Sequence, residues 1–117
     1  MDIRERLNKE ILIFDGAMGT MVQSKGLKLG ELPEVLNIKN PEMIRQIHQD
    51  YIDAGAMVLT TNTFGANELK LKNTPFEVEE IIHGAVENAR NAIGRKGIYI
   101  ALDIGPIGEL LEPMGTL

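Results

Sequence analysis

Three short apolar runs, each ended by a polar, glycine-containing turn, constrain the fold of this chain more than any other feature. The runs occupy residues 11–14, 57–59 and 98–102, and none of them alternates with polar residues. A strand that is apolar on both faces is typical of a parallel sheet covered on both sides. We therefore expect three buried strands, each followed by a loop at its carboxyl end.

Two longer segments with helical spacing separate the three runs. Residues 41–54 and 78–93 repeat apolar side chains every three to four positions, which predicts amphipathic helices. Capping residues and glycines at the expected places mark their ends. The expected boundary residues are Asn40 and Gly55 for the first helix, and Thr74, Glu77 and Gly94 or Gly97 for the second.

Shorter elements are expected between these helices and strands. Asp2 and Glu5 have capping-box spacing and predict a short opening helix. A second short helix is expected through Glu68 and Leu71. Residues 21–39 contain several glycines and a proline, which favours a loop.

The resulting order is βαβαβ in one α/β domain, which implies parallel strands joined by right-handed crossovers. Such a unit is half of a doubly wound sheet or the opening of a (β/α)8 barrel, and composition does not distinguish the two. In both folds, ligands bind at the carboxyl ends of the strands. The three turns at residues 15–20, 60–65 and 103–109 are therefore the candidate ligand site.

Composition excludes several kinds of function. The chain of 117 residues has no cysteine, so it contains no disulfide, no thiolate zinc site and no cysteine nucleophile. Its net charge of −5 argues against nucleic acid as a partner. No apolar run approaches the length of a membrane helix and the N-terminus is charged, so we expect a cytoplasmic protein without a membrane partner.

Each turn has both a functional and a structural interpretation. Asp15 at the first turn is suited to bind a ligand amine, or to hydrogen-bond nearby amides in a plain turn. The threonines and asparagine of residues 60–63 can bind a polar small molecule, or merely finish a strand. Residues 103–109 combine the Asp103 carboxylate with a rigid loop, in which Gly105 before Pro106 is compatible with a close backbone approach or an unusual peptide geometry. Of the two interpretations of this turn, a structural loop is favoured. His48 and His83 lie in expected helices, away from the ligand edge, and are interpreted as packing or surface histidines.

The turns together carry a resemblance to a known family. The segments DGAMGT at 15–20, ELPEVLNIKNPE at 31–42, TNTFGAN at 61–67 and DIGPIGE at 103–109 resemble, in order and spacing, the homocysteine S-methyltransferase family. The resemblance covers nearly the whole chain, and it is strongest to the N-terminal homocysteine-binding module of the cobalamin-dependent members.

This resemblance implies a (β/α)8 TIM-type barrel of which the chain supplies the first three βα units. Members transfer a methyl group to the sulfur of homocysteine, which is held as a thiolate by a zinc ion on three cysteines. In the cobalamin-dependent members, the methyl group comes from methylcobalamin on another module, so the implied partners are homocysteine, the remaining barrel and that module.

The resemblance also assigns roles to individual residues. Asp15 matches the aspartate that receives the substrate amino group, and Gly16 and Ala17 match amides near the substrate carboxylate. Thr61 matches a polar contact, with Asn62 and Thr63 as its neighbours in the substrate site. The residues implied to shape the site, without contacting substrate, are Gly19, Asp103 and Gly105.

Two departures from the family pattern are informative. Gly65 stands where betaine-using relatives carry an aromatic residue, which, with the DIGPIGE form of the third turn, favours cobalamin over betaine as methyl source. The absence of cysteine means that this chain supplies no metal ligand and no catalytic residue.

A barrel of this kind needs about 250 residues, so residues 1–117 are interpreted as a truncated, N-terminal part of one domain that is inactive alone. The open edge after the third strand predicts self-association, and Thr116 predicts the start of a further helix. The alternatives are a non-catalytic binding or structural module of the same ancestry and, less favoured, a barrel enzyme acting on a phosphorylated substrate.

Overall fold

The computed structural model describes residues 2–28, 30–94 and 97–107, and it is an α/β structure built on parallel strands. The two strands are β1 (Val58–Thr60) and β2 (Tyr99–Ala101). They pair in parallel, with Val58 opposite Tyr99, and an isolated parallel bridge joins Phe14 to Val58. The second and third apolar runs therefore form parallel strands as expected, whereas the first run contributes only this bridge, with β1 in the middle.

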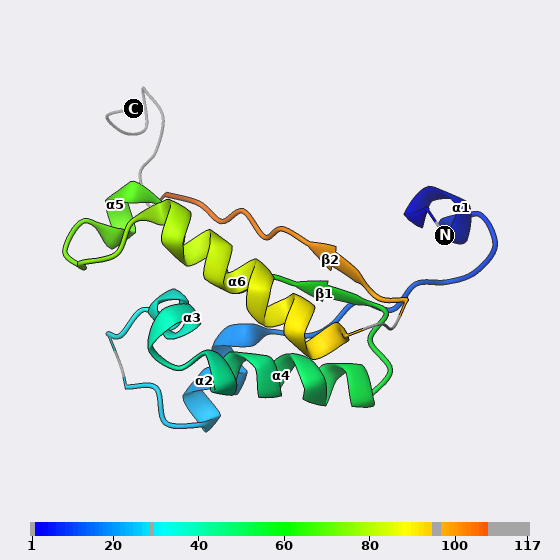
Figure 1. Cartoon of the computed structure of the whole chain (residues 1–117), viewed down its shortest axis with the longest axis horizontal. Coiled ribbons are helices and arrows are strands. Elements are labelled where there is room, and N and C mark those ends of the chain that lie inside the picture. Colours follow the sequence, from blue (N-terminus) through cyan, green and yellow to red (C-terminus); the bar gives the residue numbers. More distant parts are fainter. Residues whose placement is uncertain (1, 29, 95–96, 108–117) are drawn as a thin grey trace.

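Helices account for most of the remaining described chain. The two long ones, α4 (Pro41–Asp53) and α6 (Val78–Ile93), lie side by side along one face of the strands (Figure 1). The shorter ones are α1 (Ile3–Leu7), α2 (Met18–Ser24), the 3-10 turn η1 (Pro33–Val35), α3 (Leu36–Lys39) and α5 (Glu68–Leu71).

The helix ends follow the capping rules, with one shift. Asn40 caps α4 by accepting a hydrogen bond from the amide of Met43, and Gly94, with φ 62°, ends α6. The expected start of α6 at Thr74 is wrong, because Glu77 itself is the N-cap and forms a reciprocal capping box with Glu80. An acidic N-cap at this end also interacts favourably with the helix dipole.

The expectation of a loop over residues 21–39 is right in the middle of the stretch and wrong at its ends. The described residues between Ser24 and Pro33 form no helix or strand, and Gly26 and Gly30 take positive φ there. The ends are helical, since α2 continues to Ser24 and η1 and α3 occupy residues 33–39. Val22, on α2, packs in a buried cluster with Ile44 and Ile47 of α4, so tertiary packing accounts for the helix at that end.

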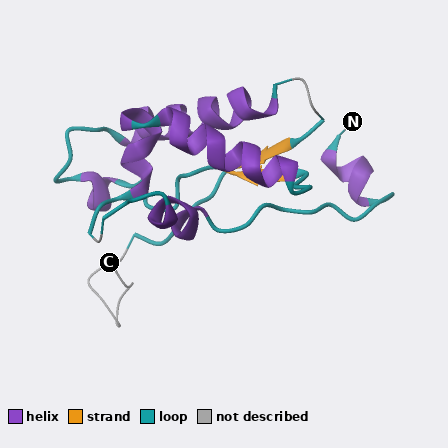
Figure 2. Ribbon diagram, turned by 90° about the horizontal axis from the view of Figure 1, so that it is seen from below, coloured by secondary structure: helices purple, strands orange, loops and turns teal. Residues whose placement is uncertain are grey.

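The buried core lies between the long helices and one face of the strands. Leu59 of β1 packs with Ala89 and Ile93 of α6, and Tyr51 and Ile52 of α4 lie against this cluster. In Figure 2 the two longest helices run close beside the strands, and the short helix at the N-terminus lies apart from them.

Burial of the three apolar runs is uneven among the described residues. Val58 and Leu59 of β1 are both fully buried, so the middle run is covered on both faces as expected. The expectation that residues 11–14 are buried on both faces is wrong, since Ile11 is 86% exposed and Phe14 is 55% exposed. In β2 no residue is fully buried, and Ile104 beyond it is 83% exposed. Each of these outer runs pairs with β1 on one side only among the described residues. The helix expected near Thr116 lies outside the described residues.

Candidate functional site

A cavity of about 420 Å³ lies where the three turns meet. It gathers residues that are far apart in the sequence, from the first turn, from η1, from the turn after β1 and from the turn after β2. Seven of the nine sequence-predicted site residues line it: Gly16, Ala17, Gly19, Thr61, Asn62, Thr63 and Asp103. The other two, Asp15 and Gly105, lie beside the lining residues.

Asp15 is fixed by the residue that ends β1. Its carboxylate accepts hydrogen bonds from the amide of Thr60 at 3.0 Å and from the Thr60 hydroxyl at 2.9 Å. Partial burial raises the pKa of Asp15, the bonds from Thr60 oppose that rise, and the nearby charge of Asp103 adds to it. Each carboxylate oxygen keeps an unused lone pair for a further donor.

The turn at Gly16 and Ala17 is held from behind by Tyr51 of α4. The Tyr51 hydroxyl donates to the carbonyl oxygen of Ala17 at 2.8 Å. A Cβ at position 16 would lie 2.9 Å from that hydroxyl oxygen, so the close approach requires glycine. The amides of Gly16 and Ala17 have no hydrogen-bond partner in the described part of the chain.

A chain of hydroxyl groups joins the second turn to the third. Thr63 donates its single hydroxyl proton to the carbonyl oxygen of Asp103 at 2.6 Å, so in the 2.7 Å contact between the two threonine hydroxyls Thr61 is the donor. The Thr61 oxygen also accepts from the amide of Asp103 at 3.2 Å. Both hydroxyl oxygens can therefore offer a ligand only a lone pair.

Asn62 lines the cavity, but its side-chain amide group is used by the protein. Its Nδ2 donates to the carbonyl oxygen of Pro33 at 2.9 Å and to Oδ1 of Asn37 at 2.9 Å. Contact between Asn62 and a substrate stays a prediction.

Gly105 packs directly on the second turn. A Cβ at this position would overlap the carbonyl oxygen of Phe64 and lie 2.8 Å from its ring. The close approach expected for the glycine before Pro106 is therefore confirmed.

Several residues that line the cavity were not predicted from the sequence. Glu34 lies in η1 and is only 4% exposed, while Phe64 and Lys70 complete the wall. The segment ELPEVLNIKNPE carried Glu34 as part of the resemblance, but interpreting residues 21–39 as loop hid its burial. The signal that could have found it is an acidic residue within an otherwise apolar stretch.

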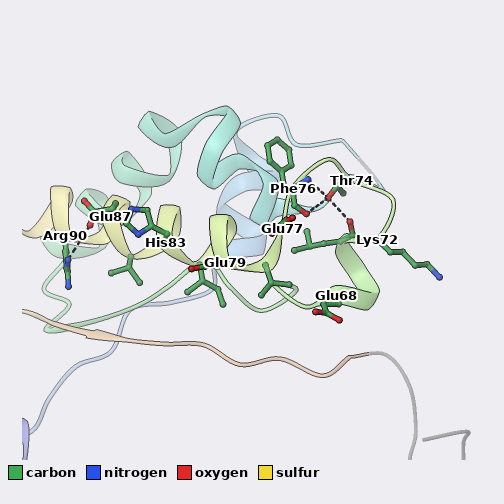
Figure 3. A pocket seen from close by; sticks show the side chains of 13 residues that line it. Glu68, Lys72, Thr74, Phe76, Glu77, Glu79, His83, Glu87 and Arg90 are labelled. Carbon is green, nitrogen blue, oxygen red and sulfur yellow. Dashed lines mark hydrogen bonds and ion pairs between the residues drawn. The ribbon is translucent and has the colours of Figure 1, made fainter.

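A larger hollow of about 1040 Å³ runs along α5 and α6 (Figure 3). Its rim mixes acidic and basic side chains, including Glu79, His83 and Arg90. It contains none of the sequence-predicted site residues. His83 is exposed here and His48 is fully buried in α4, which confirms their interpretation as surface and packing residues.

Neither a cluster of metal ligands nor a helix able to span a membrane occurs among the described residues. No group of three or more histidine, cysteine, aspartate or glutamate residues could hold a metal ion there. Within the same residues, no helix combines the length and the apolar character that crossing a membrane requires.

The cavity is thus lined by both hydrogen-bond donors and acceptors, with the Asp15 carboxylate beside it. Free backbone amides come from the first turn, and lone pairs come from Asp15, Thr61 and Thr63. Fold and site together define an α/β protein with a small polar ligand pocket at the carboxyl ends of parallel strands.

Comparison with known proteins identifies the family. The sequence model of the homocysteine S-methyltransferase family matches residues 12–116, which is most of the chain. The chain therefore belongs to the homocysteine S-methyltransferase family.

Individual relatives agree with this assignment. The chain is 38% identical over 72 residues to a methionine synthase of Mycobacterium tuberculosis. The aligned region covers 56% of the chain and 6% of that protein. It is 38% identical over 88 residues to betaine–homocysteine S-methyltransferase 1 of Bos taurus, covering 74% of the chain and 22% of that protein.

Solved structures give the same result. The metallated form of the homocysteine methyltransferase MmuM from Escherichia coli superposes with a TM-score of 0.77 at 29% identity, over 91% of this chain and 42% of that one. The oxidised form of the same protein gives a TM-score of 0.78 at 30% identity. The chain thus spans less than half the length of the relatives it matches.

Proposed function

We propose that this chain recognises the amino-acid end of homocysteine, as the N-terminal part of a methyltransferase that converts homocysteine to methionine. The observation that carries the proposal is that unpartnered amides at Gly16 and Ala17 and the acceptor oxygens of Thr61 and Thr63 line one small cavity, with the Asp15 carboxylate beside it. An α-amino acid presents a carboxylate and an ammonium group a few ångströms apart, and it needs both kinds of partner.

The proposed roles follow from which groups are free. The carboxylate of Asp15 takes the substrate ammonium with the lone pairs that Thr60 leaves unused. The amides of Gly16 and Ala17 take the substrate carboxylate. Thr61 and Thr63 can accept from the ammonium but cannot donate to the carboxylate, because their protons are already committed.

Zinc would hold the homocysteine sulfur as a thiolate in the whole protein, but the residues of this chain do not fit that metal. The sequence has no cysteine, and the described residues contain no cluster of three potential ligands. We therefore propose that the zinc ligands lie in the rest of the barrel, and that this chain alone performs substrate binding without methyl transfer.

Methylcobalamin is the proposed methyl donor, with cobalamin carried by another module. The relatives include both a methionine synthase and a betaine-using enzyme at equal identity, so identity does not separate the donors. Support comes from Gly65, where the Glu34 carboxylate fills the space that a side chain would need. An aromatic cage residue for a quaternary ammonium therefore does not fit at this position.

Exposed apolar side chains support the remaining barrel as a partner. Ile11, Phe14 and Ile104 are more than half exposed, and the remaining strands and helices of a (β/α)8 barrel would cover apolar surface of this kind. A cytoplasmic location is part of the same proposal.

Titration calorimetry tests the proposal. L-homocysteine is titrated into the chain, with L-methionine and betaine as comparison ligands, and then into a fusion of the chain with the part of the Escherichia coli relative that it does not cover. Homocysteine binding by the chain, with methyl transfer only in the fusion, supports the proposal. Binding without methyl transfer in the fusion supports a non-catalytic module, and no homocysteine binding in either contradicts the proposal.

A further inference from the structure

Glu34 is the most deeply buried carboxylate of the cavity, and the roles proposed above leave it unused. It is 4% exposed and lines the same cavity as Thr61 and Thr63. Among the described residues it forms no ion pair. A buried carboxylate without an ion pair is costly unless hydrogen bonds compensate it.

The compensation comes from the turn after β1. The backbone amides of Glu34 itself and of Gly65 lie near enough to the Glu34 carboxylate to favour its ionised form, and so does the Lys70 cation. Lys70 also lies 5.4 Å from the centre of the Phe64 ring. Glu34 thus contacts the turn that carries three cavity-lining residues, Thr61, Thr63 and Phe64.

Gly65 is matched to Glu34 in shape as well as in hydrogen bonding. A Cβ at position 65 would overlap Oε1 of Glu34 and lie 3.1 Å from its carboxyl carbon. Residue 65 is buried and has no positive φ, so backbone conformation does not require glycine here. The carboxylate of Glu34 requires it.

We propose that Glu34 and Gly65 are a matched positioning pair that fixes the ligand geometry of the cavity. The carboxylate takes the volume of a side chain at residue 65 and holds the turn through the Gly65 amide, so the threonine lone pairs keep their places. The pair is a specificity feature of the cavity, and its effect on homocysteine rests on the proposed function.

The first test detects the pair without any ligand. Proton and nitrogen NMR shifts of the Gly65 amide are followed from pH 3 to 8 in the 117-residue chain and in Glu34→Gln. Burial raises the pKa of Glu34 above its ordinary value of 4.5, with the charge of Asp103 adding to the rise and Lys70 opposing it. We expect the Gly65 amide to titrate with a midpoint above 4.5, and the titration to disappear in Glu34→Gln.

Asp15 and Asp103 are the other carboxyl groups near the cavity, so their effect must be separated. Asp103→Asn, as a second variant, should leave the Gly65 titration in place with a lower midpoint. A Gly65 amide that does not titrate, or that titrates equally in Glu34→Gln, overturns the proposal.

The second test is a double-mutant cycle on the steric match. Gly65→Ala should weaken homocysteine binding at least tenfold, while in the Glu34→Ala background the same change should weaken it less than twofold, because the obstacle is gone. Gly97→Ala is the control, since a Cβ there meets no atom within 4 Å. Additive effects of the two substitutions overturn the match.

The outcomes separate this inference from the function on which it rests. If the chain does not bind homocysteine, the proposed function fails, and the same cycle is then measured on urea unfolding. Coupling in unfolding, together with the Gly65 titration, supports the matched pair in that case. If neither the coupling in unfolding nor the Gly65 titration is observed, the proposed pair of Glu34 and Gly65 is overturned.

Discussion

Asn37 and Asn62 form a reciprocal pair of hydrogen bonds. Nδ2 of Asn37 donates to the backbone oxygen of Asn62 at 2.8 Å, and Oδ1 of Asn37 accepts from Nδ2 of Asn62 at 2.9 Å. Asn37 also donates to the carbonyl oxygen of Ile81 at 3.1 Å, and its own carbonyl oxygen accepts from Asn88 at 3.1 Å. This buried network ties α3 and α6 to the turn that lines the cavity.

Replacing Asn37 by aspartate should therefore be strongly destabilising. The substitution keeps the size but removes the donors to two buried carbonyl oxygens and buries a charge, which should lower the free energy of unfolding by about 2–4 kcal/mol. Urea unfolding followed by circular dichroism measures the change. Asn91→Asp is the matched control, because residue 91 is exposed on α6, and equal losses in both variants would contradict the network's role.

Because His48 is buried, we expect the folded chain to lose stability in mild acid. The ring is fully buried and neither ring nitrogen has a hydrogen-bond partner among the described residues. Burial lowers the pKa of His48 from 6.5 to about 4. Because the unfolded chain binds the proton first, stability is lost as pH falls from 6.5 toward 4, by on the order of 3 kcal/mol.

His48→Leu should remove that part of the pH dependence. The free energy of unfolding is measured by urea at several pH values between 4 and 7, and the difference between wild type and variant isolates His48 from the carboxyl groups. Burial raises the pKa of Asp15 and of Glu34, so these two groups act in the opposite direction in both proteins. A wild-type-minus-variant difference that is flat with pH, or that His83→Leu reproduces, would refute the assignment.

The sequence predicted the elements whose signals are local, and it missed those that depend on packing. The cap of α4 at Asn40 and the end of α6 at Gly94 follow from residue type alone. The helices between residues 18 and 39 do not, because Val22 is held by contacts with α4 rather than by helix propensity. Exposure of Ile11 was also beyond sequence reasoning, since it depends on which elements lie beside residues 11–14 in the fold.

The candidate site shows the same division. Spacing and resemblance brought together seven of the residues that line one cavity, because parallel strands align their carboxyl ends. Glu34 was missed because its burial arises from the turn at Gly65, more than thirty positions away. The acceptors of the Thr61 and Thr63 hydroxyl protons likewise could not be predicted, because they depend on where the fold places Asp103.

Exposed apolar side chains in and beside the strands predict self-association of the chain in solution. Ile11, Phe14 and Ile104 are each more than half exposed, and burying such surface against a second copy is favourable by about 25 cal/mol per Å². Sedimentation velocity from 5 to 200 μM should show a concentration-dependent rise in mass, which Ile11→Lys combined with Ile104→Lys abolishes. Leu69→Lys, at an exposed leucine of α5, is the control; a wild type that stays monomeric throughout contradicts the prediction.

Asp15→Asn tests the ammonium site directly. The change removes the negative charge and places an amide group against the Thr60 amide, which donates to Oδ2 at 3.0 Å in the present structure. Loss of a charge-assisted hydrogen bond of about 1.5–3 kcal/mol should weaken L-homocysteine binding by about 10- to 100-fold. Calorimetry measures the change, and Asp53→Asn, on the exposed end of α4, should leave the affinity unaltered. The same titration with 4-mercaptobutyric acid, which is homocysteine without the ammonium group, should show no difference between wild type and Asp15→Asn. Equal weakening for both ligands would place the role of Asp15 in holding Thr60 rather than in binding the ammonium group.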